Sequence, residues 1–186
     1  MIKGFREFLG DDRGTATIEF VLLVPMVLTI FFASFESSFY MIRSVMLERS
    51  VDIVVREIRL GTLDNVTHKI LKQRFCETSA LVFSVDACVA KMRVWMQPIN
   101  TATFSMVTPQ RHCMDKSANV NPDDPPPTGE FAFGSDNDIM LLSICLLEEP
   151  LFPTTIVGAA LVGANGNGDD ENYGIVVTSV FVNEPG

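Results

Sequence analysis

The sequence is poor in the residue patterns that enzymes and metal sites use. It has two histidines, His68 and His112, and neither stands in a C-x-x-C or H-x-x-x-H spacing of the kind that binds zinc. It has no G-x-S-x-G elbow, no P-loop, no convincing pair of carboxylates and no Cys–His pair in the setting of an activated nucleophile. We therefore expect the chain not to be an enzyme, and we expect no metal or cofactor.

A polar loop near the C-terminus comes closest to a metal site. Asn165, Asn167, Asp169 and Asp170 offer oxygen ligands of the kind that calcium prefers. The loop lacks the glycine and the closing acid of an EF-hand at the required positions. A hairpin or connecting loop is therefore the preferred interpretation, with calcium as the alternative.

Positive charge is also scarce. The chain has 23 Asp and Glu residues against 14 Lys and Arg, which gives a formal net charge of −9 at pH 7. Nucleic acids and anionic membrane surfaces attract basic patches, so this balance argues against both as partners of any exported part. The hydrophobic share is 47% and the mean hydropathy is +0.26, as expected for one membrane span plus a small core.

Charge is scarcest from Thr15 to Phe35, where Glu19 is the one ionisable side chain. A helix needs about 20 mostly apolar residues to cross a bilayer, and this run is apolar on every face, unlike an amphipathic core helix. Lys3, Arg6 and Arg13 precede the run. By the positive-inside rule, they predict a single-pass protein with a cytoplasmic N-terminus and an exported remainder.

A glycine, Gly14, stands before the apolar run rather than after it. Signal peptides are cut after their apolar segment, so a cut at Gly14 would leave the hydrophobic helix on the mature chain. We expect residues 1–14 to be a leader and Thr15 to become a new N-terminus close to Glu19. The alternative is an uncleaved single-pass anchor that carries a periplasmic scaffold or binding protein.

The residues around this glycine resemble a known processing site. The motif R-G-T-A-T-I-E-F places Glu19 five residues after Gly14 and resembles the prepilin-peptidase site of type IV pilins and pseudopilins. The longer pattern G-x-x-x-x-E-F-V-L-L-x-P, which includes Pro25, resembles the TadE-like family, the minor pilins or pseudopilins of tight-adherence (Tad/Flp) pili. The terminal V-F-V-N-E-P resembles the same family, whereas the middle of the chain is similar only in outline.

The resemblance implies assembly rather than chemistry, in a bacterial inner membrane with the C-terminal domain in the periplasm or outside the cell. A prepilin peptidase would cut between Gly14 and Thr15. In the helix that also holds Phe20 and Pro25, Glu19 would set the register of assembly, for instance by meeting the amino group of a neighbouring subunit. The implied partners are this peptidase, other Tad pilins, the pilus assembly machinery and membrane lipid. The implied pilus serves surface adherence and biofilm formation. The resemblance is compatible with a TadE, a TadF or a TadG type of role.

The long helix is expected to continue beyond the membrane. No glycine or proline follows the apolar run before Gly61, and apolar residues recur at helical spacing. Pro25 lacks the N–H that would bond the carbonyl four residues back, so we expect a bend there. The expected organisation is a transmembrane helix over 15–36, its amphipathic extension over 37–61 and an extracytoplasmic domain over 62–186.

The expected domain is α+β with an antiparallel sheet. A short second helix is predicted over 65–77 from its apolar spacing. Strands are predicted over 81–85, 89–97, 139–147 and 174–182. The run 139–147 is almost continuously apolar, which predicts the centre of the sheet. Residues 115–138 are rich in turn formers and predict an exposed loop.

Four cysteines, Cys76, Cys88, Cys113 and Cys145, lie on the predicted outer side. An even count in an oxidising compartment permits two disulfides and three pairings. Cys76 and Cys88 bracket the first predicted strand, so we favour their pairing, with Cys113 joined to Cys145 across a longer loop. The alternative is that one or more of the four is a buried thiol.

Overall fold

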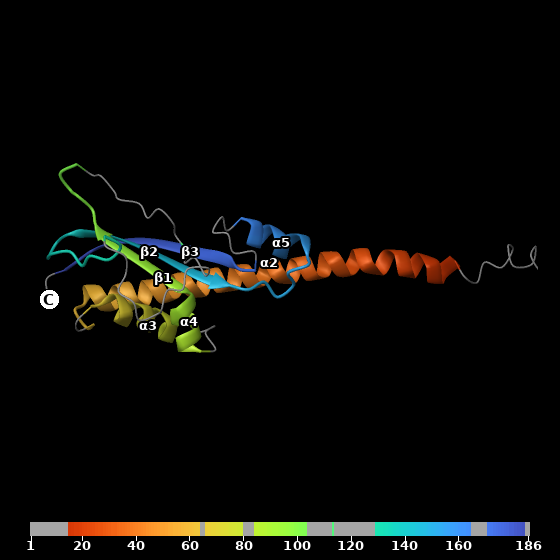
Figure 1. The fold of residues 1–186 in the computed structure, drawn as a ribbon, viewed down its shortest axis with the longest axis horizontal. Coiled ribbons are helices and arrows are strands. Elements are labelled where there is room, and N and C mark those ends of the chain that lie inside the picture. Colours follow the sequence, from red (N-terminus) through yellow and green to blue (C-terminus); the bar gives the residue numbers. More distant parts are fainter. Residues whose placement is uncertain are drawn as a thin grey trace, which may run out of the picture.

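The computed structural model describes residues 15–63, 66–79, 84–103, 113, 129–164 and 171–184. A long helix, α2 (Thr15–Arg59), packs its C-terminal half against a small domain, and its N-terminal half projects beyond that domain (Figure 1). The other elements, in chain order, are α3 (His68–Thr78), α4 (Val85–Lys91), β1 (Met92–Pro98), β2 (Ile139–Glu148), α5 (Ile156–Gly163) and β3 (Tyr173–Val182). The α+β class expected from the sequence is confirmed.

The sheet has three strands, with β2 between β1 and β3 and antiparallel to both. Leu146 of β2 lies opposite Met92 of β1 and Ile175 of β3, which gives the register. Residues 140–147 are all buried. The almost continuous apolar run therefore does form the central strand, as predicted.

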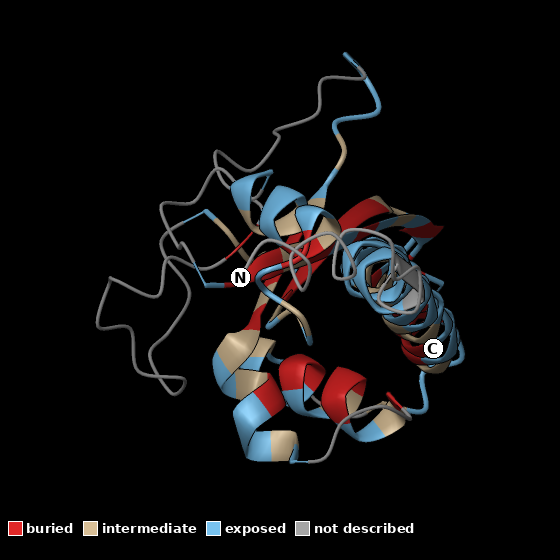
Figure 2. Ribbon diagram, turned by 90° about the vertical axis from the view of Figure 1, so that its right-hand side faces the viewer, coloured by how far each residue is buried: buried red, intermediate tan, exposed pale blue. Residues whose placement is uncertain are grey.

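The main core lies between one face of the sheet and the helices α2 and α3. Figure 2 shows buried stretches, in red, both in the sheet and in the helices that surround it. The most buried members include Leu47, Val51, Val54, Leu71, Phe75, Met92, Val94, Met96, Leu142 and Ile144. Each large apolar side chain contributes about 1.5–3 kcal/mol when it leaves water. This burial fixes the C-terminal half of α2 to the domain.

One predicted strand is wrong at its C-terminal end. Residues 81–83 of the predicted strand 81–85 lie outside the described residues, but Val85 begins the helix α4. The hydroxyl of Ser84 caps this helix by accepting the backbone N–H of Ala87 at 3.4 Å. The next predicted strand, 89–97, consequently begins three residues late, at Met92. A short apolar segment does not show its period clearly, and here the helix cap decided the outcome.

Other expectations shift by smaller amounts. The second helix begins at His68 rather than 65, because Thr67 caps it and accepts the N–H of Ile70. Within the last part of the predicted loop, Phe131 forms a parallel bridge with Met96 of β1, whereas Asn137 donates its backbone N–H to the carbonyl oxygen of Asn183, just after β3. The predicted leader, His112, residues 115–128 and the polar loop 165–170 lie outside the described residues.

Both expected disulfide pairs occur in the structure. Cys76 at the end of α3 is bonded to Cys88 of α4, which holds these two short helices together. Cys113 is bonded to Cys145, in the middle of β2, on the face of the sheet opposite the main core. The four described cysteines are thus two cross-links rather than free thiols.

Candidate functional site

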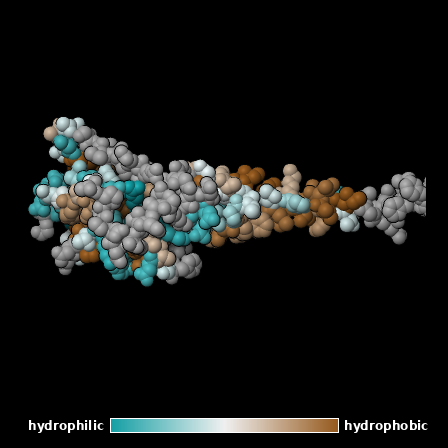
Figure 3. Space-filling view, viewed as in Figure 1, coloured by the Kyte–Doolittle hydropathy of each residue, from teal (hydrophilic) through white to brown (hydrophobic). Residues whose placement is uncertain are grey.

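The first part of the candidate site is the projecting half of α2. Figure 3 shows hydrophobic residues along this half, whereas the surface of the domain is mixed. Ile18, Phe20 and Leu22 are between 64% and 72% exposed. In the described part of the chain, α2 is the one helix long and apolar enough to cross a membrane, and its most apolar stretch has no buried residue. A soluble core helix would be mostly buried, so α2 fits a single-pass membrane anchor.

The residues predicted for processing and assembly lie at the start of this half. Gly14 is outside the described residues, and Thr15 is the first residue of α2. Glu19 and Phe20 follow one turn later, and both side chains are exposed. The helix continues through Pro25, which is exposed as well. The structure therefore puts Glu19 on an outward surface, but the roles of these residues stay predictions.

The second part of the site is the junction at Glu36, where the apolar run ends. Glu36 is fully buried. Its carboxylate accepts the backbone N–H of Leu151 at 3.2 Å and that of Phe152 at 2.8 Å. The ring of Phe152 packs on Phe32, one turn before Glu36, with 4.7 Å between the ring centroids. The turn after β2 is thus clamped to α2 at the edge of the apolar run.

Sequence reasoning missed this clamp. In the sequence, Glu36 indicates only where the apolar run ends. Its partners are main-chain N–H groups far along the chain, and such groups leave no pattern in the sequence. A weak signal existed in the segment E-E-P-L-F-P, where Pro150 and Pro153 flank two residues whose N–H groups need an acceptor. Backbone donors that leave water are almost always paired, so an acceptor elsewhere in the chain was to be expected.

Arg43, two turns after Glu36, makes the second connection between α2 and the domain. Its guanidinium donates to the carbonyl oxygen of Glu149 at 3.0 Å and to the hydroxyl of Tyr173. It also lies 3.7 Å from the carboxylate of Glu148. Burial raises the pKa of Tyr173, although the neighbouring guanidinium opposes this shift. Glu36 and Arg43 together fasten the end of β2 and the start of β3 to one face of α2.

Ion pairs complete the attachment at the far end of α2. Arg74 of α3 donates to both carboxylate oxygens of Glu57, at 2.7 and 2.8 Å. This hydrogen bonding lowers the pKa of Glu57. Arg59 pairs with Glu184, just after β3. Because the domain is held along residues 36–59, the position of the helix determines the position of the domain.

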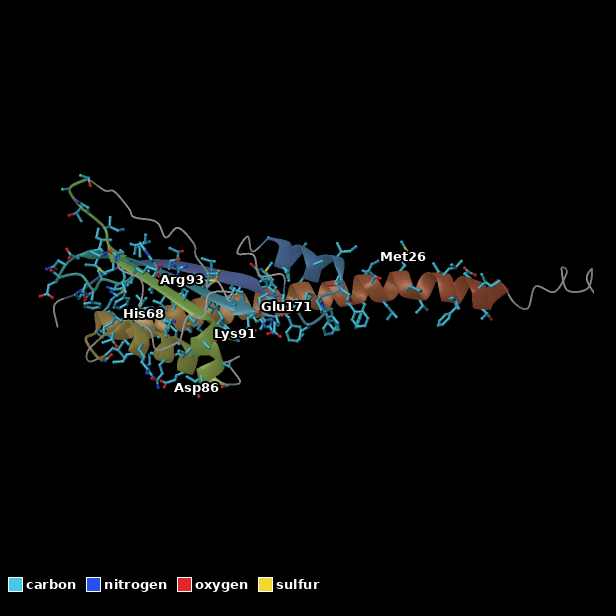
Figure 4. The ribbon with its side chains drawn as sticks, in the orientation of Figure 1. Met26, His68, Asp86, Lys91, Arg93 and Glu171 are labelled. Atoms are coloured by element: carbon cyan, nitrogen blue, oxygen red, sulfur yellow. A yellow bond between two sulfur atoms is a disulfide. The ribbon has the colours of Figure 1, made fainter. Side chains whose placement is uncertain are left out.

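Polar side chains also connect α3 and β1, and Figure 4 labels two of them, His68 at the start of α3 and Arg93 on β1. Arg93 pairs with Glu130 and donates to the carbonyl oxygen of Cys113 at 3.1 Å. His68 Nε2 lies 3.2 Å from the carbonyl oxygen of Val94. Lys72 is 5% exposed, and burial lowers its pKa, with a further contribution from Arg93. These contacts hold α3, β1 and residue 130 together and supply no nucleophile with an activating base.

A hollow of the described surface lies beside α5. It is lined mainly by proline and small apolar residues, together with Glu149 and Glu171. Across the described ranges, no group of three or more His, Cys, Asp and Glu side chains is placed to hold a metal ion. The arrangement as a whole suits insertion of the exposed apolar half of α2 into a membrane or its packing against another helix.

Comparison with protein families adds an independent observation. Residues 14–56 match the family model described as TadE-like protein. Comparison with curated proteins and comparison with solved structures give no match. The matched range covers the projecting half of α2 and most of its packed half, including Glu36 and Arg43, and it supports a protein associated with a Tad pilus. Over residues 14–56, this chain is similar to the TadE-like family.

Proposed function

We propose that this chain is a minor pilin or pseudopilin of the TadE-like kind, cut after Gly14 by a prepilin peptidase and assembled into a Tad/Flp-type pilus. Such a pilus would serve surface adherence and biofilm formation. The observation that carries the proposal is the projecting half of α2, which is apolar, unburied and matched to the family, with Glu19 one turn from its start.

Before assembly, residues 15–35 would lie in the inner membrane. A helix of this length measures about 30 Å at 1.5 Å per residue, which equals the hydrocarbon thickness of a typical bilayer. An unpaired carboxylate deep in the bilayer costs about 2.5–3.5 kcal/mol on insertion scales, so an acid there needs a partner. The amino group created at Thr15 of a neighbouring subunit would supply it.

Assembly would then place the domain as well as the helix. Glu36, Arg43 and Arg59 tie the helix to the domain along its packed half. A register set by Glu19 would therefore pass directly to the sheet. The domain would meet other Tad pilins or the assembly machinery at a defined height above the membrane.

The proposed orientation has the N-terminus in the cytoplasm and the domain in the periplasm or outside the cell. Lys3, Arg6 and Arg13 support it through the positive-inside rule. The two disulfides support it independently, because such bonds persist in oxidising compartments.

The test is the N-terminus of the mature protein. The full chain is produced with its prepilin peptidase, extracted from membranes with detergent, and examined by intact-mass spectrometry and N-terminal sequencing. We expect a start at Thr15, and we expect Gly14→Val to abolish cleavage. Gly10→Val, a matched change at the other glycine near the end of the leader, should leave cleavage intact. A parent chain that still begins at Met1 beside an active peptidase would support an uncleaved periplasmic scaffold and reject the proposal.

A further inference from the structure

The segment from Pro150 to Ala164 contains no ionisable residue. It comprises the turn after β2 and the helix α5, and we call it the apolar tip. Ile156 in this tip is 77% exposed, more than any other large hydrophobic side chain among the described residues, and Leu151 is 46% exposed. Apolar side chains this exposed, in a segment without charge, indicate a surface that meets something other than water.

The apolar tip lies beside the end of the proposed membrane span. Phe152 packs on Phe32, and the carboxylate of Glu36 binds the N–H groups of the same turn. Figure 1 shows α5 alongside α2, at the end of the domain that faces the projecting half. The apolar surface of α2 is therefore continuous with that of the tip.

The backbone of the turn meets a second requirement for contact with lipid. Polar main-chain groups are costly near hydrocarbon unless the protein itself satisfies them. Leu151 and Phe152 donate to Glu36, and Pro150 and Pro153 have no N–H to satisfy. Thr155 accepts the N–H of Gly158 at 3.0 Å and thereby caps α5. The turn and the start of the helix thus bring paired donors to the surface.

Charge returns immediately behind the tip, and it is paired. Arg43 lies 3.7 Å from Glu148, and Lys91 lies 3.2 Å from Glu149. This order, from apolar span to apolar tip to ion pairs, matches the change in polarity from hydrocarbon to water. The tip and α2 both change from apolar to charged at the same distance along the helix axis. A bilayer surface requires this coincidence, whereas binding to a protein partner does not.

We propose that the apolar tip rests in the headgroup region of the bilayer, beside the point where α2 leaves it. The inference rests on the proposed function, because it needs residues 15–35 in the membrane. Helices that lie in the membrane interface bury their apolar face about 5–10 Å into the boundary between headgroups and acyl chains. With a net charge of −9, the protein would make this contact through apolar burial, so zwitterionic lipid should suffice and salt should have little effect.

The experiment places tryptophan probes in the full chain, reconstituted in phosphatidylcholine vesicles. Trp95 is the single native tryptophan and is buried, so Trp95→Phe gives a dark background. Ile156→Trp probes the tip, Leu23→Trp probes the span, and Val180→Trp is the control on β3, where the side chain is 56% exposed. Should the background fail to fold, the same three changes are made in the Trp95 chain, and the added quenching is measured against the parent.

We expect Leu23→Trp to be quenched best by lipids brominated deep in the acyl chains. Ile156→Trp should be quenched best by lipids brominated near the glycerol, several-fold more strongly than Val180→Trp. Acrylamide should reach Val180→Trp and be excluded from Ile156→Trp.

Three outcomes would overturn the inference. If Leu23→Trp is quenched by lipid while Ile156→Trp behaves like Val180→Trp, the tip is in water, and only the membrane span of the proposed function is supported. If Ile156→Trp emission is blue-shifted without lipid quenching and depends on the protein-to-lipid ratio, a second copy covers the tip. If Leu23→Trp is not quenched, the span itself is absent, and the proposed function fails together with the inference.

Discussion

Oε2 of Glu36 accepts the backbone N–H of Phe152 at 2.8 Å, across 116 positions of sequence. The donor belongs to the turn after the central strand, and the acceptor belongs to the helix that carries the apolar run. Because Glu36 is fully buried, this bond is shielded from water and joins the span directly to the domain.

Removing the carboxylate should loosen this junction. Glu36→Ala leaves the part-buried N–H groups of Leu151 and Phe152 without this acceptor, and a hydrogen bond to a charged group contributes about 1.5–3 kcal/mol. We therefore expect the free energy of unfolding of the domain to fall by about 3 kcal/mol. The measurement is thermal or denaturant unfolding in detergent, followed by near-UV circular dichroism. Proteolysis should also begin at the turn near Phe152.

Glu48→Ala is the matched control, because Glu48 is an exposed acid on the same helix. It should change the free energy of unfolding by less than about 0.5 kcal/mol, as usual for surface positions. Equal destabilisation by both changes would show that helix propensity matters here and that the buried carboxylate does not.

The disulfides should contribute unequally to stability. Cys76 and Cys88 are separated by 12 positions, and Cys113 and Cys145 by 32. On the loop-entropy relation, these spans correspond to about 3 and about 4 kcal/mol. We expect the double change Cys113→Ala with Cys145→Ala to lower the unfolding midpoint more than Cys76→Ala with Cys88→Ala, measured without reductant. The parent under dithiothreitol should fall below both, and an unchanged midpoint there would contradict the assignment.

Acid should destabilise the domain through His68 before it affects the carboxylates. Burial lowers the pKa of His68 below its usual 6.5, and nearby Lys72 adds to this, while Val94 O and Glu130 oppose it. The unfolded chain therefore binds the proton more readily just below pH 6.5, so stability falls as the pH drops through that range. The slope for one group is at most about 1.4 kcal/mol per pH unit. We expect His68→Gln to make the unfolding midpoint less dependent on pH between pH 7 and the pKa of folded His68.

Glu57 provides the contrast for this pH experiment. Hydrogen bonding from Arg74 lowers the pKa of Glu57 below 4.5, so its contribution is present above that pH and is lost as the pH falls through the folded pKa. Glu57→Gln should therefore leave the slope near pH 6 intact. A parent midpoint that is flat from pH 7 to pH 5 would contradict the role of His68.

Periodicity in the sequence was sufficient for the long elements. The run 139–147 is apolar at nearly every position, which only a strand buried on both faces or a core helix requires, and its length favoured the strand. The packed half of α2 was equally clear, because its stripe of apolar residues extends over several turns. In both cases, many side chains repeat the same signal.

Short elements and main-chain partners were beyond such reasoning. The helix α4 has seven residues, too few to show a helical period, and its cap at Ser84 was the informative feature. The buried carboxylate of Glu36 accepts backbone N–H groups, which every residue except proline has, so no residue type in the sequence marks its partners. The position of the apolar tip beside Phe32 follows from the same long-range contact and was equally invisible.

The exposed acid near the start of α2 should matter for assembly and not for folding. Glu19 projects from the free half of the helix, so Glu19→Gln should leave the unfolding midpoint of the domain unchanged. It should still be cut after Gly14, yet lose the charge that we propose pairs with a neighbouring amino group, and so fail to co-purify with the proposed partner pilins from cross-linked membranes. Thr17→Ala, a matched change at an exposed position two residues earlier, should co-purify normally. Normal cleavage and normal co-purification of Glu19→Gln would reject the pairing, because an uncharged amide forms no ion pair with an amino group.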